Sequence, residues 1–206
     1  MPLPRFSRLT QEQQKHVLSV ARARFASDGV DGASYSRIIA DAGISKTSAY
    51  QYFDGRADLL AAVLTDVAER ASAVLGPWQD ARNSAAFWSQ LDEGARRLVD
   101  HLVRNPDDRA LLNVGVPILD VVGSWFDRIV ANAVELGLIR SDLDPDLLLA
   151  ATAKTFEAID GWVLKRISDA AGTNTASVDL DDAWRLLARV WGTPALLVPR
   201  SPRGIR

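Results

Sequence analysis

The sequence predicts an all-α protein of about nine helices, in which an N-terminal three-helix module precedes a C-terminal helical domain. Three observations predict this class. Apolar residues recur at intervals of three and four positions along most of the 206 residues, as on one face of a helix. No segment alternates between apolar and polar residues for six positions, as a half-buried strand would. Capping residues, glycines and prolines separate the periodic segments.

The first predicted helix begins at Thr10, which has Gln13 three positions later and so forms the sequence pattern of a capping box. The segment 27–32 contains two glycines and ends this helix. The apolar stripe that faces the core consists of Val17, Ala21 and Phe25. We therefore expect an amphipathic helix of about five turns at the start of the chain.

Two short helices follow, and a tight turn joins them. Ser34 is the expected cap of the second helix, and Gly43 ends it. Ser45 is the expected cap of the third helix, in which Ala49 and Phe53 point inward at a spacing of four. Two short helices joined by a turn with glycine describe a helix-turn-helix.

Longer helices fill the remainder of the chain. The first of them spans 56–75 and ends at Gly76 and Pro77. Asn105 and Asp144 each precede a proline at the first position of a helix, which is where proline is favoured. The other helices are predicted at 83–104, from 105 onward, at 117–136, at 144–167 and at 179–191. We expect two domains, which span residues 1–55 and 56–206.

The third helix presents polar side chains on its outer face, namely Lys46, Thr47, Tyr50 and Gln51. A helix this short depends on its neighbours for order, and hydrogen-bonding groups that point outward suit insertion into a DNA major groove. Residues 1–54 carry seven basic and five acidic side chains, although the whole chain has a net charge of −2. The residues alone leave a second interpretation open, in which this face is merely solvated and its tyrosines are ordinary surface or core aromatics.

The segment 24–60, "RFASDGVDGASYSRIIADAGISKTSAYQYFDGRADLL", resembles the DNA-binding module of the TetR (tetracycline-repressor-like) family of transcriptional regulators. The positions in register are Phe25, Gly29, Ser34, 42–45, Tyr50, 52–53, Arg56 and 59–60. The departures from the family pattern are Ser36 for arginine, Ile39 for alanine, Thr47 for glycine, Ala49 for leucine and Arg56 for lysine. Those at Ser36 and Thr47 put the operator preferences of the family in doubt for this chain.

The resemblance implies a set of DNA contacts. Base edges would be read by Lys46, Thr47 and Tyr50, with Ser36 as a further candidate. Phosphates would be held by Ser34, Ser45, Gln51, Tyr52 and Arg56. It also implies a homodimer, formed by the last two helices of each protomer, that binds a near-palindromic operator. An ordinary monomer core is the alternative explanation of those two helices.

The middle helices are rich in aromatic residues, and the chain holds six tryptophans. A mostly apolar cavity with a few polar groups is typical of a small-molecule site, and the resemblance implies an inducer pocket in this region. The candidate ligand-binding residues are Phe87, Trp88, His101, Asn113, Trp125, Phe126, Phe156 and Trp162. The alternative is that the aromatics fill the core. The expected function is that of a repressor that a small apolar or aromatic ligand releases from DNA.

Other classes of function find less support. The chain has no cysteine, which excludes disulfides, thiolate zinc sites and cysteine nucleophiles. His16 and His101 are isolated, and no phosphate-binding glycine loop is present, so we expect no enzyme, no metal and no cofactor. A helical adaptor that binds only protein is the remaining rival. No apolar run approaches the roughly 20 residues of a membrane span and no signal peptide is recognisable, which favours a cytoplasmic protein.

Overall fold

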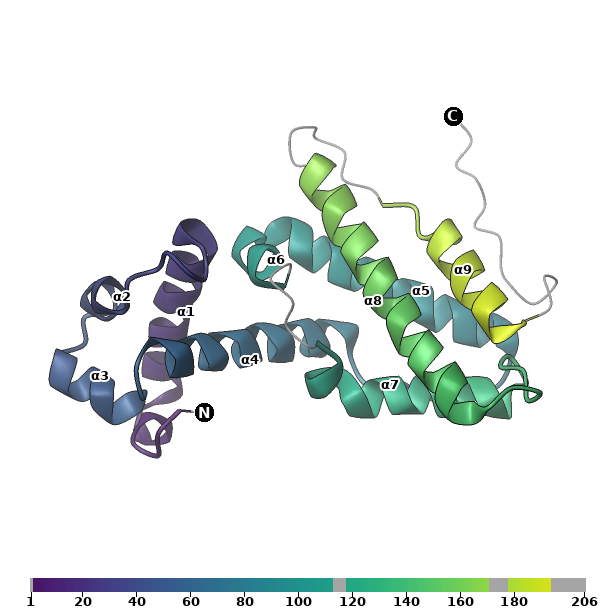
Figure 1. Ribbon diagram of the computed structural model, residues 1–206, viewed down its shortest axis with the longest axis horizontal. Coiled ribbons are helices and arrows are strands. Elements are labelled where there is room, and N and C mark those ends of the chain that lie inside the picture. The colour runs from purple at the N-terminus through teal and green to yellow at the C-terminus, as the bar shows by residue number, and fades with distance from the viewer. Residues whose placement is uncertain (1, 113–117, 171–177, 194–206) are drawn as a thin grey trace. The chain divides into compact units, whose positions relative to one another are not determined.

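The computed structural model describes residues 2–112, 118–170 and 178–193, and in these ranges it contains nine α-helices, one 3-10 helix and no strand (Figure 1). The predicted all-α class is therefore confirmed. The elements are η1 (Phe6–Arg8), α1 (Gln11–Asp28), α2 (Tyr35–Asp41), α3 (Lys46–Tyr52), α4 (Arg56–Leu75), α5 (Ser84–Arg104), α6 (Pro106–Leu112), α7 (Ile118–Glu135), α8 (Pro145–Ala170) and α9 (Asp181–Trp191).

Local capping explains why most helices begin where the sequence predicts. Thr10 and Gln13 form a complete capping box at the start of α1. The Ser45 hydroxyl accepts a hydrogen bond from the Ser48 N–H at 3.1 Å, and the Asp144 carboxylate accepts one from the Leu147 N–H at 3.0 Å. Ser34 occupies the capping position of α2 as predicted, but its side chain makes no capping bond, and only its main-chain carbonyl accepts bonds from that helix.

The start of the last helix also differs from the prediction. α9 begins at Asp181 rather than near Asp179. The Asp179 carboxylate does accept a hydrogen bond from the Asp181 N–H at 3.0 Å, but Leu180 occupies the capping position and makes no side-chain bond. Leu180 is buried, so its packing adds to the Asp179 hydrogen bond at this end of the helix.

The chain divides into two compact units, which comprise Met1–Ala71 with Asn105–Val121, and Ser72–Arg104 with Val122–Arg206. This division differs from the predicted domains 1–55 and 56–206. The predicted boundary separates a DNA-binding domain from a ligand-binding and dimerisation domain, and it remains a prediction. The first unit therefore draws α6 from a later stretch of the chain. Each unit has its own buried core.

The first unit is built around α1, which packs against α2 and α6. Phe25, Ile38 and Phe53 are each almost completely buried in its core. α6 contributes Asp108, a buried acid whose carboxylate lies 3.2 Å from Arg22 Nε of α1 and 3.0 Å from Arg70 Nε of α4. The positive charges of Arg22 and Arg70 thus compensate the buried negative charge of Asp108.

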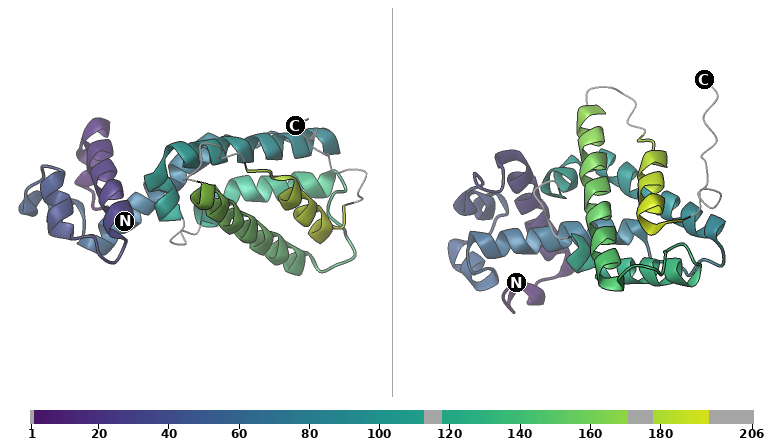
Figure 2. Two further views of the ribbon diagram at one scale, coloured as in Figure 1. Left: turned by 90° about the horizontal axis from the view of Figure 1, so that it is seen from above. Right: turned by 45° about the vertical axis from the view of Figure 1, so that its right-hand side comes forward.

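In the second unit, α8 lies beside α5 and α9 (Figure 2). Its core holds a cluster of ring contacts with centroid distances between 5.0 and 6.2 Å. The rings are those of Trp78, Phe87, Trp88, Trp125 and Trp191. Among the described residues, no helix combines the length and apolar character that crossing a bilayer requires.

Candidate nucleic-acid interface

The turn between α2 and α3 fixes the orientation of α3. Gly43 adopts a φ of +67°, a left-handed conformation that favours glycine, within the turn of residues 42–45 that joins the two helices. On the inner side of α3, Ala49 and Phe53 are fully buried, as predicted. The Ser45 cap satisfies an N–H group at the start of the helix. The seven-residue helix is therefore held by its neighbours rather than by its own length.

The outer face of α3 is open. Lys46, Thr47, Tyr50 and Gln51 are all exposed, and Tyr50 has 61% of its surface accessible. An exposed tyrosine of this size on a short helix is available to a partner, because it contributes little to the core. The predicted outward orientation of these four side chains is thus what the structure shows.

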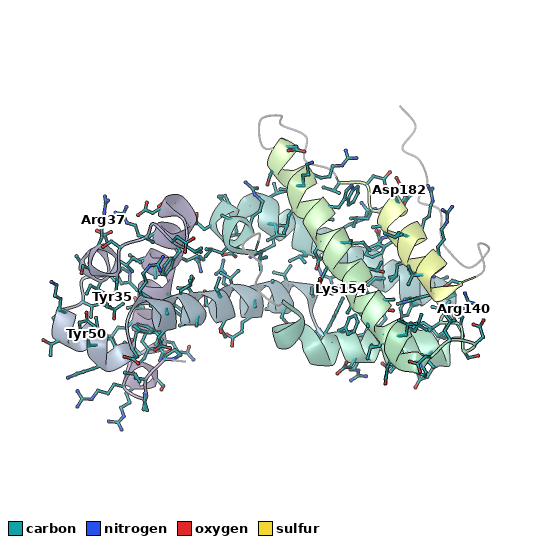
Figure 3. The ribbon with its side chains drawn as sticks, viewed as in Figure 1. Tyr35, Arg37, Tyr50, Arg140, Lys154 and Asp182 are labelled. Atoms are coloured by element: carbon teal, nitrogen blue, oxygen red, sulfur yellow. The ribbon has the colours of Figure 1, made fainter. Side chains whose placement is uncertain are left out.

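Tyr35 of α2 supports the Tyr50 ring, and the sequence analysis missed it. The two ring centroids lie 5.7 Å apart, and both side chains lie on the same part of the first unit (Figure 3). The Tyr35 hydroxyl is buried without a hydrogen-bond partner among the described residues. Burial, and then the proximity of Tyr50 and Asp58, raises the pKa of Tyr35 above its ordinary value, so its ring stays neutral. A tyrosine directly after the predicted cap of α2 was the signal that could have revealed this contact.

The candidates for phosphate binding occupy different environments. Ser34 and Ser36 are exposed, and the Ser34 hydroxyl makes no capping bond, which leaves it free for another partner. The Ser45 hydroxyl is already engaged with Ser48. Tyr52 is half-buried against Phe6, with 6.2 Å between the ring centroids.

Two further candidates have partners that the sequence analysis did not foresee. Arg56 Nε donates a hydrogen bond to the Ala33 carbonyl at 2.8 Å, and its guanidinium lies 5.7 Å from the centre of the Phe25 ring. Arg56 therefore joins the start of α4 to the core of the first unit. The Gln51 amide oxygen accepts a hydrogen bond from Arg5 Nη1, which makes Arg5 a neighbour of the exposed face of α3.

Residues 17–63 match the family model described as bacterial regulatory proteins of the tetR family. This range contains the turn, α3 and all nine side chains that were predicted to contact DNA. The chain carries the DNA-binding module of the TetR family at residues 17–63. It is accordingly a DNA-binding transcriptional regulator.

Solved structures share the fold of this TetR-family chain. A proposed transcriptional regulator from Streptomyces coelicolor superposes with a TM-score of 0.55 at 21% identity, over 88% of this chain and 99% of the other. A proposed TetR-family regulator from Vibrio parahaemolyticus gives a TM-score of 0.54 at 21% identity, over 88% and 97%. No curated protein matches the sequence. At these identities the structural likeness shows the fold alone.

The predicted ligand-binding residues of this TetR-family regulator do not form one group. Phe87 and Trp88 are completely buried in the aromatic cluster, to which Trp125 belongs through its contact with Trp78. Phe126 and Phe156 form a separate pair with centroids 5.7 Å apart. Arg166 stacks over Trp162, and His101 is half-buried on α5. Asn113 lies outside the described residues.

Proposed function

We propose that this TetR-family regulator is a repressor that binds a near-palindromic operator as a homodimer, and that a small apolar or aromatic ligand releases it. The observation that carries the DNA-reading part is the exposed polar face of α3 above a fully buried Ala49 and Phe53. Such a helix offers its side chains to base edges while the fold holds its backbone. DNA as the partner also favours the cytoplasm as the place of action.

Each exposed side chain suits a particular partner. Lys46 can donate hydrogen bonds to guanine O6 and N7, and the Thr47 methyl group can contact a thymine methyl group. Tyr50, steadied by the Tyr35 ring, presents a flat apolar surface and a hydroxyl. The hydroxyls of Ser34 and Ser36 on α2 and the side chains of Ser45, Gln51, Tyr52 and Arg56 are the candidates for fixing the register through phosphates and sugars.

Substitutions on α3 test this proposal. An operator selected from a random duplex pool should lose affinity by roughly 1–3 kcal/mol for each of Lys46→Ala and Tyr50→Ala, because each removes a base contact. Arg128→Ala is the control for Lys46→Ala, since Arg128 is an exposed basic residue of α7, outside the proposed interface, and its loss changes the net charge equally. Wild-type affinity and sequence preference in both α3 variants would contradict the proposal.

The dimer is proposed from unpaired apolar side chains on the last two helices. Leu147 and Leu149 of α8 and Leu186 of α9 are exposed large hydrophobic residues. Exposed apolar groups of this size on adjacent helices are typical of a protein interface. A dimer supplies two reading helices for two half-sites, which explains why the operator is expected to be near-palindromic.

Ligand release is proposed as a shift between two populations of the dimer, one with its reading helices correctly spaced for the operator. α4 is the candidate lever, because its residues 56–71 belong to the first unit and its last residues to the second. A ligand that binds more tightly to the incorrectly spaced population lowers the operator affinity. The ratio of its affinities for the two populations limits the size of this effect. Fluorescence of the tryptophans can identify ligands. Equal operator affinity with and without every ligand so found would contradict this mechanism.

A further inference from the structure

The N-terminal segment, defined as Leu3–Arg8, has an ordered conformation of its own. Its backbone closes into a short 3-10 helix through hydrogen bonds from the Phe6 N–H to the Leu3 carbonyl at 2.9 Å and from the Arg8 N–H to the Arg5 carbonyl at 3.2 Å. The Ser7 hydroxyl donates to the Pro4 carbonyl at 3.2 Å. These bonds reduce the number of conformations that any later contact would have to fix.

The N-terminal segment is fastened to the end of α3. The Leu3 N–H donates a hydrogen bond to the Tyr52 carbonyl at 2.8 Å, where α3 ends. Phe6 is buried, with its ring centroid 4.7 Å from that of Phe53 and 6.2 Å from that of Tyr52. The one aromatic side chain of the segment thus packs directly against the helix that is proposed to read bases.

The charge of the segment is purely positive. Arg5 and Arg8 are exposed, and the first acidic residue of the chain is Glu12. Arg5 donates one hydrogen bond to Gln51, whose side chain belongs to the exposed face of α3. A guanidinium has five N–H donors and a full charge, and a neutral amide oxygen satisfies only one donor and none of the charge. A guanidinium with free donors and an uncompensated charge can bind a phosphate oxygen.

We propose that the N-terminal segment is a second DNA-contacting element, in which Arg5 binds a backbone phosphate beside the site where α3 enters the groove. This inference rests on the proposed function of α3. The contact adds affinity without sequence preference, because every nucleotide offers the same phosphate. The contact would lie next to α3, since Leu3 and Phe6 tie the segment to the end of that helix.

Salt dependence tests the proposal, with the selected operator and a random duplex of equal length as probes. Each phosphate that a protein neutralises contributes about 0.9 to the slope of log affinity against log salt. Arg5→Ala should therefore reduce the slope by roughly 1 for each bound protomer, or about 2 for a dimer. Affinity for the two duplexes should fall by the same factor, so that their ratio stays unchanged. Arg5→Lys keeps the charge and should restore most of the slope.

Arg82→Ala is the matched control, because it removes an exposed arginine from the second unit with the same change in net charge. A wild-type salt slope in Arg5→Ala would overturn the inference. A loss of affinity confined to the selected operator would also overturn it, because Arg5 would then act on bases through Gln51. If Lys46→Ala lost sequence preference and Arg5→Ala kept the wild-type slope, the proposed function of α3 would hold and the Arg5 contact would be wrong. A wild-type protein that shows no preference between the two duplexes would overturn both.

Discussion

Asn132 is a buried side chain whose amide group is hydrogen-bonded through both of its ends. Its oxygen accepts bonds from Trp78 Nε1 at 3.2 Å and from the Ala81 N–H at 2.7 Å, and its nitrogen donates to the Ala81 carbonyl at 3.2 Å. It thereby joins the segment after α4 to α7. Backbone groups of Ala81 and the indole of Trp78 would lose their partners without it.

Asn132→Ala should accordingly lower the free energy of unfolding by about 2–4 kcal/mol, because it leaves buried polar groups unsatisfied. The control is Asn83→Ala at the start of α5, where an exposed asparagine makes one capping bond to the Ala86 N–H at 2.9 Å and about 1 kcal/mol is expected. Urea unfolding measures both. Equal losses in the two variants would show that the buried network contributes nothing beyond an ordinary cap.

Asp160 on α8 predicts a pH dependence of stability. Burial, with Glu157 nearby, raises the pKa of the Asp160 carboxyl from 3.8 to about 7. The folded protein therefore keeps a proton that the unfolded chain releases between these values, so stability falls as pH rises from about 4 to about 7 and changes no further above that. Asp160→Asn should remove this fall and raise stability at pH 8 by at least about 1 kcal/mol.

Thermal unfolding across this pH range measures the effect of Asp160. Asp169→Asn is the control, because it removes an exposed acid from the same helix and should keep the fall in stability. If Asp160→Asn and the wild-type protein lost stability in parallel between pH 4 and 7, the carboxyl would not be the source.

Residue-level predictions from the sequence succeeded where the partners are close in the chain. The capping pair Thr10 and Gln13 is recognisable because capping requires a spacing of three. Arg56 and Gln51 show the opposite case. Their partners, Ala33 and Arg5, lie 23 and 46 positions away, and no local spacing rule connects them. The sequence therefore indicated which side chains surround α3 but not which of them are already engaged.

At the scale of elements, the turn before α3 depends on the backbone conformation of Gly43 rather than on lack of space. A Cβ atom at Gly43 would meet no heavy atom within 4 Å, yet the φ there is +67°. Gly43→Ala should destabilise the protein by about 1–2 kcal/mol, because an L-residue is strained in the left-handed region. It should also weaken operator binding, since α3 would have to shift.

Gly161 provides the matched control in α8. A Cβ atom would also meet nothing within 4 Å there, and the backbone is helical. Gly161→Ala should therefore stabilise the protein by roughly 0.5–1 kcal/mol, because alanine is the better helix former. Urea unfolding of the two variants isolates the effect of φ. The same sign in both would refute the explanation for Gly43.

Helix positions were predicted to within a few residues because glycine and proline mark their ends and apolar spacing marks their faces. Gly137, which follows α7, and Pro145, which begins α8, are examples. The start of α9 was predicted two residues too early because the capping position is held by Leu180, and a buried leucine carries no recognisable signal of a helix end.

At the scale of the whole molecule, the proposed homodimer predicts that a charge on α9 separates the protomers. Leu186→Glu places a carboxylate where 46% of a leucine is exposed, so it should cost the monomer little while disfavouring burial against a second copy. Sedimentation at micromolar concentration should show a shift toward monomer, and operator affinity should fall by at least tenfold.

Val103→Glu is the control for Leu186→Glu, because it adds the same charge at an exposed apolar residue of α5. This variant should remain a dimer. A wild-type protein that sediments only as a monomer, or a Leu186→Glu variant that stays dimeric, would contradict the assignment of α9 to the interface.

The organisation of the molecule was the hardest level to predict. The spacing of apolar residues identifies α6 as a helix but says nothing of its partner, and it is α1, far away in the sequence, against which α6 packs. The aromatic residues of the middle helices likewise looked equivalent in the sequence. Only the fold shows that Phe87 and Trp88 belong to a closed cluster and Phe126 and Phe156 to another pair.

The position of Asp108 limits how this protein can be re-engineered. Its carboxylate is shared by Arg22 and Arg70, so residues 1–71 alone would leave both guanidinium groups without that partner and would uncover the surface that α6 occupies. Chimaeras that graft the operator preference of this chain onto a foreign sensor by exchanging an N-terminal fragment would inherit that defect. A transplant needs residues 105–112 as well, either in place or supplied as a spliced second piece.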